Sequence, residues 1–128
     1  MDSLIEKLKK LDDFISYGGA TPTSIEAAER ELDLVFANEY KEYLTAFGAV
    51  CGSGFELTGI VNNKRLNVVY VTKEMREKAS VPNNLYVIEE MHIDGLVIWQ
   101  DASGCIFQTT PGSTPVKIAD SFAEYLTT

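Results

Sequence analysis

The sequence predicts an α+β fold in which helices cover a mainly antiparallel, twisted β-sheet of about five or six strands. Apolar residues recur at helical spacing through residues 3–47, whereas short runs rich in β-branched and aromatic residues dominate from residue 54 onward. With 128 residues, 45% of them hydrophobic and 23% charged, the chain has the composition of an ordinary globular protein. It is long enough to bury a core of its own, so a single domain is expected over residues 1–128.

The first helix is predicted over residues 3–17. Ser3 and Glu6 form a capping-box pair, in which each side chain accepts a hydrogen bond from a backbone N–H left free at the helix start. Gly18 and Gly19 would end the helix, because glycine tolerates the left-handed conformation of a helix stop. The stripe facing the core would consist of Leu4, Leu8, Leu11 and Ile15.

Two further helices are predicted before residue 50. The second opens with a capping box of Thr23 and Glu26, directly after Pro22. Its inner stripe is Ile25, Ala28 and Leu32. The third begins at Asn38, and its inner stripe is Tyr40, Tyr43, Leu44 and Phe47. Because these rings share one stripe that faces the core, we interpret them as packing residues and not as a substrate pocket.

Six runs in the second half of the chain are predicted to form strands of an antiparallel meander. They comprise residues 54–60, 65–71, 84–90, 95–100, 105–110 and 114–118. A helix over residues 72–79, begun by Thr72 and ended before Pro82, interrupts the meander. Asp101 and Gly104 predict a tight hairpin turn between two of the strands. A terminal helix would place its apolar stripe on Ile118, Phe122, Tyr125 and Leu126.

The charge balance limits the partners of this protein. With 11 Lys and Arg against 19 Asp and Glu, the formal net charge of -8 repels nucleic acid and anionic lipid and attracts basic proteins. No apolar run approaches the roughly 20 residues that span a bilayer, and the N-terminus lacks the pattern of a signal peptide. We therefore expect a cytoplasmic protein that binds neither nucleic acid nor membrane, with Cys51 and Cys105 as reduced thiols.

Reactive side chains do not converge in the sequence, so we do not expect an enzyme. Glu89 and Glu90 are neighbours on a predicted strand and project to opposite faces, so they cannot serve one substrate as acid and base. His92, the only histidine, lies between two strands and is interpreted as a surface residue. Cys51 lies in the glycine-rich segment 48–54, which follows a helix, whereas phosphate-binding loops run from a strand into a helix. Neither a cofactor nor a metal ion is expected.

The order of these elements resembles the SUKH superfamily. The resemblance is carried by "SIEAAERELDLVFANEYKEYLTAFGAV" and "FELTGI", then "VTKEMREK", "VPNNLYVIEE", "GLVIWQDASGCIF" and "PVKIADSFAEYL", and it spans residues 23–126. Each piece is common, but the ordered set over most of a domain is far more specific. The resemblance implies an α+β domain that in bacteria usually acts as an immunity protein bound to a secreted or contact-delivered toxin, frequently a nuclease.

Charge and resemblance together predict an antitoxin that neutralises a basic cognate toxin, possibly a nuclease, by stoichiometric protein binding. The alternative is a regulatory or scaffold module without a toxin partner, and a third interpretation is a hydrolase or metal protein that uses His92 or Cys51. The acids expected to contact the partner are Glu39, Glu42, Glu56, Glu89, Glu90, Asp94 and Asp101.

Overall fold

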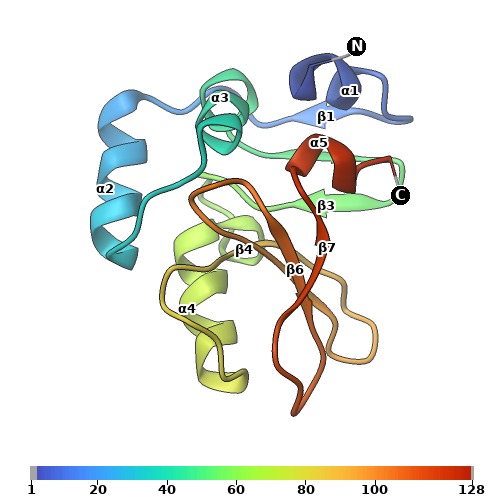
Figure 1. Ribbon diagram of the computed structural model, residues 1–128. Coiled ribbons are helices and arrows are strands. Elements are labelled where there is room, and N and C mark those ends of the chain that lie inside the picture. The colour runs from blue at the N-terminus through green and yellow to red at the C-terminus, as the bar shows by residue number, and fades with distance from the viewer. Residues whose placement is uncertain (1–2, 128) are drawn as a thin grey trace.

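The computed structural model describes residues 3–127 and has the α+β fold that the sequence predicts (Figure 1). Residues 1–2 and 128, at the ends of the predicted domain, lie outside the described part of the chain. The described part holds five α-helices, one 3-10 helix and seven strands, which form two antiparallel sheets. The class is therefore as predicted, but the strands are divided between a three-stranded and a four-stranded sheet.

The first helix, α1 (Leu4–Lys9), is shorter than predicted. Ser3 caps it by accepting a hydrogen bond from the Glu6 N–H (3.2 Å). The chain then turns through Asp12, whose backbone exchanges hydrogen bonds with Ser53, and continues into strand β1 (Ile15–Ser16). Ile15 therefore lies in a strand, where it pairs with Cys51, and not on the helix stripe.

The next two helices match their predicted inner stripes. Helix α2 (Pro22–Leu32) is capped by Thr21 and Ser24, not by the predicted pair. Proline favours the first helical position, so the residue before it becomes the cap. Helix α3 (Asn38–Phe47) ends at Gly48, whose φ of 73° lies in the region that favours glycine. The buried stripes are Ile25, Ala28 and Leu32 on α2 and Tyr40, Tyr43, Leu44 and Phe47 on α3.

The four-stranded sheet is the predicted meander. Its order is β4-β5-β6-β7, formed by Tyr86–Glu90, Val97–Gln100, Ile106–Thr109 and Val116–Ala119. The three-stranded sheet, in the order β1-β2-β3, adds β2 (Val50–Gly52) and β3 (Phe55–Leu57) to β1. We did not predict β1 or β2, because each is too short to show an alternating pattern.

Residues 65–71 were wrongly predicted as a strand. They enter a short 3-10 helix, η1 (Lys64–Leu66), and then helix α4 (Val68–Lys78). Asn67 caps α4 by accepting hydrogen bonds from the backbone N–H groups of Val69 and Tyr70. The β-branched residues favour a strand locally, but this cap and the packing of α4 on the sheet outweigh that preference.

The terminal helix, α5 (Phe122–Tyr125), is also shorter than predicted. Ile118 belongs to β7 and is not part of the helix, since β7 pairs with β6 as far as Ala119. Ser121 caps α5 by accepting a hydrogen bond from the Glu124 N–H (3.0 Å). The helix therefore contributes Phe122 and Tyr125 to the core. Leu126, which also belongs to the predicted stripe, is partly buried and packs against this core.

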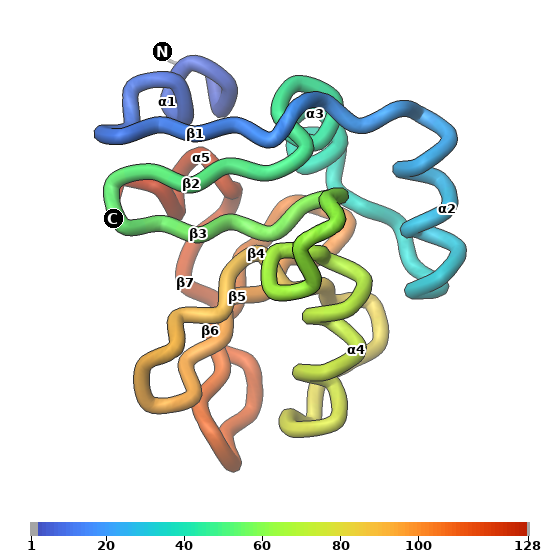
Figure 2. The backbone as a smooth tube through the Cα atoms, turned by 180° about the vertical axis from the view of Figure 1, so that it is seen from behind, coloured from blue at the N-terminus to red at the C-terminus, as the bar shows by residue number. Residues whose placement is uncertain are grey.

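The two sheets meet where β3 approaches β4. The Thr58 N–H donates to the Ile88 carbonyl (2.8 Å), and the Thr58 hydroxyl donates to the Val87 carbonyl (2.7 Å). Figure 2 shows β1, β2 and β3 on one side of the molecule, with α1 and α5 behind them. The main core lies under α2, α3 and α5, and a second cluster under α4 includes the fully buried Trp99.

Candidate functional site

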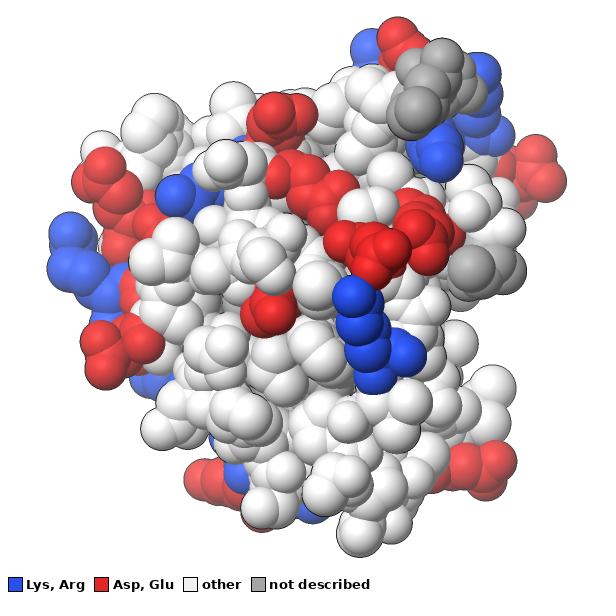
Figure 3. Space-filling view, in the orientation of Figure 1, with Lys and Arg blue, Asp and Glu red and all other residues white. Residues whose placement is uncertain are grey.

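Acid side chains from distant parts of the chain gather on one face of the protein. Figure 3 shows them in a band across the upper half of this face, over α3 and α5, with one basic side chain below; the lower half is nearly free of charge. We call this set the acidic band; it consists of Glu39, Glu42, Asp101, Asp120 and Glu124. The fold thus brings together three of the seven predicted contact residues, Glu39, Glu42 and Asp101.

Glu39, a member of the acidic band, connects three elements of the fold. Its Oε1 accepts a hydrogen bond from the Phe122 N–H (2.6 Å), at the start of α5, and another from Gln100 Nε2 (2.8 Å), on β5. Gln100 is fully buried and also donates to the Gly104 carbonyl (3.0 Å). The carboxylate of Glu39 is therefore partly engaged in holding the fold, whereas Glu42, one turn later, is exposed.

Asp101 forms the hairpin turn that the sequence predicts. Its Oδ1 accepts hydrogen bonds from the backbone N–H groups of Ser103 and Cys105, both 3.0 Å long, and from the Ser103 hydroxyl. Gly104 adopts a φ of 101°, which allows the chain to reverse. A Cβ added to Gly104 would lie 3.4 Å from Glu39 Oε1, so the turn lies against α3.

Glu89 is buried, which corrects the expectation of an exposed contact residue. Only 3% of its surface is exposed, and its two carboxylate oxygens accept from the Glu56 N–H and the Tyr125 hydroxyl, each at 2.8 Å. Desolvation by burial raises the pKa of this carboxyl group above its ordinary value. Glu89 therefore joins β3, β4 and α5 from inside and offers no surface to a partner.

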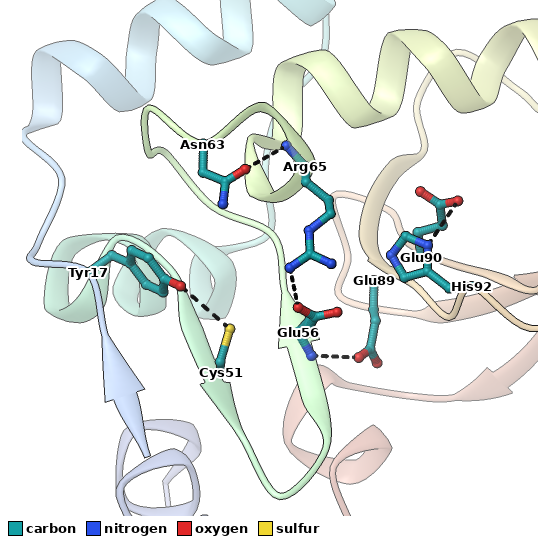
Figure 4. A network of polar contacts seen from close by, with 8 residues as sticks. All are labelled: Tyr17, Cys51, Glu56, Asn63, Arg65, Glu89, Glu90 and His92. Carbon is teal, nitrogen blue, oxygen red and sulfur yellow. Dashed lines mark hydrogen bonds and ion pairs between the residues drawn. The ribbon is translucent and has the colours of Figure 1, made fainter. Parts of the chain in front are cut away.

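Glu56 and Glu90 each have a cationic or ionisable neighbour (Figure 4). The Glu56 carboxylate accepts a hydrogen bond from Arg65 (2.7 Å), while its backbone N–H points to Glu89. Glu90 Oε2 lies 3.6 Å from His92 Nδ1. Both carboxylates are partly exposed. As the sequence predicts, Glu89 and Glu90 face opposite sides of the strand, since Glu89 meets α5 and Glu90 lines a cavity beside α4.

The loop between β4 and β5 carries the remaining predicted acid, Asp94. Residues 91–95 are all exposed, including the apolar Ile93 at 59%. His92 and Asp94 both have positive φ, at 58° and 51°. His92 is therefore a surface residue, as the sequence predicts, and the loop projects from the sheet.

Cys51 lies beside a tyrosine and not beside a base. Its thiol is 3.8 Å from the Tyr17 hydroxyl, on the outer face of the three-stranded sheet (Figure 4). This contact with Cys51, more than burial, raises the pKa of Tyr17. Within residues 3–127, no three His, Cys, Asp or Glu side chains lie close enough to hold a metal ion. The segment 48–54 forms β2 and its turn, which agrees with its place after a helix.

A cavity of about 240 Å³ lies between the C-terminal end of α4 and the four-stranded sheet. Apolar side chains supply most of its wall, with Met75 and Ala79 from the α4 end, Val97 from β5 and Pro111 after β6. Lys78 and Glu90 also line it. Thr109, another lining residue, accepts a hydrogen bond from the Trp99 indole N–H (2.9 Å), which fixes this part of the wall.

Comparison with known families assigns the chain. A family model of the SUKH superfamily, SUKH_5, described as SMI1-KNR4 cell-wall, matches residues 1–128. The chain belongs to this family. A search of curated proteins found no match. No helix in the described part of this SUKH domain is long and apolar enough to cross a membrane.

Sequence reasoning missed two acids of the SUKH domain's acidic band, Asp120 and Glu124. Asp120 pairs with Lys117 (2.6 Å), and Glu124 lies in the first turn of α5. The helix start was visible in the sequence, but 83 residues separate Glu39 from Phe122, and no local signal shows that they meet. The arrangement presents a negative surface over α3 and α5.

Proposed function

We propose that this SUKH domain is an immunity protein that binds a basic toxin, such as a nuclease, in the bacterial cytoplasm and blocks it stoichiometrically. Binding alone would account for neutralisation, so no turnover is required of the domain. The observation that supports this most directly is the acidic band, which gathers five acids of this net negative chain on one face of a SUKH fold (Figure 3).

Charge gives the domain a way to find such a partner quickly. Enzymes that act on nucleic acid carry basic surfaces, because they must attract phosphate groups. An acidic surface attracts the same basic groups and raises the rate of encounter. A domain that covers those groups would also prevent the toxin from reaching its nucleic-acid substrate.

The predicted contact residues do not contribute equally to this proposal. Glu42 is exposed on the acidic band, and Glu39 and Asp101 lie in the same band with part of each carboxylate used internally. Glu56, Glu90 and Asp94 remain candidate contacts outside the band. Glu89 is no longer a candidate, since it is buried.

Coexpression tests the proposed function. The domain is expressed with the toxic protein encoded beside it, and we expect growth to be rescued and a complex of fixed stoichiometry to copurify. Inhibition of the purified toxin should be complete at one equivalent of domain. A domain that rescues growth at catalytic amounts, or that copurifies with several unrelated proteins and no toxin, would contradict the proposal.

A further inference from the structure

The three-stranded sheet has one buried face and one open face. Val50 and Leu57, which pair across β2 and β3, are fully buried on the inner face. The neighbouring row of Ile15, Cys51 and Glu56 pairs across all three strands and therefore points to the outer face. Figure 2 views the sheet from this side and shows α1 and α5 behind it, with no helix of the described chain in front of these strands.

Large apolar side chains are exposed on this outer face. Ile15 is 55% exposed, and Tyr17, two residues further along on the same face, is 44% exposed. The Tyr17 hydroxyl lies 3.8 Å from the Cys51 thiol, which is in the middle of the central strand (Figure 4). We call Ile15, Tyr17 and Cys51 the outer patch. Contiguous exposed apolar side chains with a polar rim are typical of protein contact surfaces.

The acidic end of the outer patch is formed by Asp12 and Asp13, just before β1. The Asp12 N–H donates to Ser53 Oγ (2.8 Å), so these acids lie beside the turn that joins β2 to β3. Both acids are exposed. One end of the sheet therefore carries negative charge.

The basic end of the outer patch is formed by Lys64 and Arg65, both exposed and both in η1. The Gly59 N–H, just past β3, donates to the Leu66 carbonyl (2.7 Å), so η1 lies at the end of the sheet away from the β2–β3 turn. Arg65 also donates to Glu56 (2.7 Å) on the outer face (Figure 4). The charge along the strands therefore changes from negative to positive.

We propose that the outer patch is the interface of a homodimer, in which the open faces of two copies pack together. A two-fold interface uses the same surface on both copies, so this surface must complement itself. The axis would lie between the two sheets, run across the strands and pass over Cys51. It places the acidic end of each copy opposite the basic end of the other, with Ile15 and Tyr17 packed at the centre.

The charge distribution favours a second copy over a basic toxin at this surface. The outer patch has one end of each sign, so a uniformly basic partner would be attracted at one end and repelled at the other. Two chains with a net charge of -8 repel each other at long range, and the balanced charges make this face suitable for their contact. The proposal does not depend on the proposed function.

A dimer of this kind leaves the acidic band accessible. Helix α5, which carries Glu124 of the band, packs on the inner side of the sheet, where the Tyr125 ring contacts Phe55 (ring centroids 6.0 Å apart). The band and the outer patch therefore lie on different sides of the domain. Each copy in the dimer keeps its own acidic band for a toxin.

Sedimentation equilibrium of the full chain tests dimerisation. We expect a Kd on the order of 10–100 μM, because a small interface gives a weak complex. Ile15→Ser should weaken the dimer at least fivefold through loss of apolar contact at its centre. Val35→Ser, at a similarly exposed apolar residue between α2 and α3, is the control and should change nothing. A chain that stays monomeric, or a dimer that responds equally to both substitutions, would overturn the proposal.

Charge exchange tests the orientation of the two copies. Lys64→Glu with Arg65→Glu makes both ends acidic, and Asp12→Lys with Asp13→Asn makes the acidic end basic; asparagine tolerates the φ of 57° at residue 13. Each variant alone should dimerise at least tenfold more weakly, whereas a mixture of the two should form a heterodimer. The second variant is less negative than the natural chain, so a dimer controlled by net charge alone would tighten. Tightening, or a mixture that stays monomeric, would contradict the arrangement.

The two free cysteines report where the axis lies. Both are partly exposed, and Cys51 of one copy should face Cys51 of the other across the axis. A short bismaleimide should therefore link two chains through Cys51. Cys51→Ser should abolish this link, and Cys105→Ser, on the hairpin between β5 and β6, should preserve it. A link that requires Cys105 would place the interface elsewhere and overturn the proposal.

Toxin inhibition separates the dimer from the proposed function. The Ile15→Ser domain should inhibit the toxin as completely as the natural chain does, because the acidic band lies on another side. If the natural chain is monomeric and Ile15→Ser loses toxin binding, the outer patch belongs to the toxin interface and the dimer proposal is wrong. A natural chain that dimerises and neutralises no toxin would contradict only the proposed function.

Discussion

The carboxylate of Glu39 accepts a 2.6 Å hydrogen bond from the backbone N–H of Phe122, a residue 83 positions later in the chain. The same oxygen accepts from Gln100, so one side chain joins α3, β5 and the start of α5. Within the acidic band, Glu39 therefore helps to hold the fold together, whereas Glu42 and Glu124 are exposed. Substitutions within it will have different consequences according to this division.

Glu39→Ala should lower the free energy of unfolding by about 1–3 kcal/mol, because the Phe122 N–H and the buried Gln100 amide each lose an acceptor. Denaturant unfolding measures this loss, and amide hydrogen exchange at Phe122 should accelerate. Glu42→Ala, one turn along the same helix and exposed, is the matched control and should change stability by less than about 0.5 kcal/mol. Equal effects of the two substitutions would show that the Glu39 contacts do not stabilise the domain.

Glu89 should make the stability of the domain decrease as the pH rises. Desolvation by burial raises its pKa in the folded state above the ordinary value of 4.5, so the folded state binds the proton more tightly than the unfolded state. The stabilisation is fully present below the ordinary pKa and is lost as the pH rises through the raised one. The hydrogen bonds that Glu89 accepts from the Glu56 N–H and the Tyr125 hydroxyl lower its pKa and oppose this effect, as does His92, whereas the charge of the Glu56 carboxylate adds to it.

The substitution Glu89→Gln tests this linkage. A glutamine can still accept from the Glu56 N–H and can donate to the Tyr125 hydroxyl, so both neighbours keep a partner. Denaturant unfolding from pH 4 to 8 should show a flatter stability profile for the variant and no loss at neutral pH. Glu77→Gln, an exposed carboxylate on α4, serves as the control. A variant profile that still follows the wild-type slope would mean that another group causes the pH dependence.

Gly59 should not tolerate any side chain. A Cβ at this position would lie 1.6 Å from the Gly48 carbonyl oxygen, which itself accepts a hydrogen bond from the Ile60 N–H (2.9 Å). Because both clashing groups are backbone, Gly59→Ala should cost about 4 kcal/mol or more, or prevent folding. Gly54→Ala, which meets nothing within 4 Å but has a φ of 83°, should cost about 1–2 kcal/mol. Thermal unfolding compares the two, and similar losses would contradict the close approach.

Patterns within short segments of the sequence correctly predicted a helix stripe and a hairpin turn of this fold. The stripe from Tyr40 to Phe47 and the turn at Asp101 follow from side-chain spacing and backbone conformation, and both are present. Strand β1 was missed because two residues are too few to show the alternation of apolar and polar side chains that marks a strand. In addition, Ile15 continues the helical spacing of the apolar residues in the preceding helix. Burial of Glu89 depends on Tyr125 approaching across the fold, which no segment of the sequence reveals.

Association of the domain with a basic toxin should slow as salt increases, because exposed charges are screened beyond about 8–10 Å at physiological ionic strength. Glu42 and Glu124 are exposed members of the acidic band, so Glu42→Gln with Glu124→Gln should reduce the association rate by roughly two- to tenfold at low salt. The dissociation rate should change little, since neither carboxylate is buried in the free domain. Stopped-flow measurements at several salt concentrations distinguish these rates. Glu26→Gln with Glu77→Gln, exposed on α2 and α4 and outside the band, is the control with the same change of charge. If the control slows association as much as a band substitution does, net charge and not the acidic band directs the encounter.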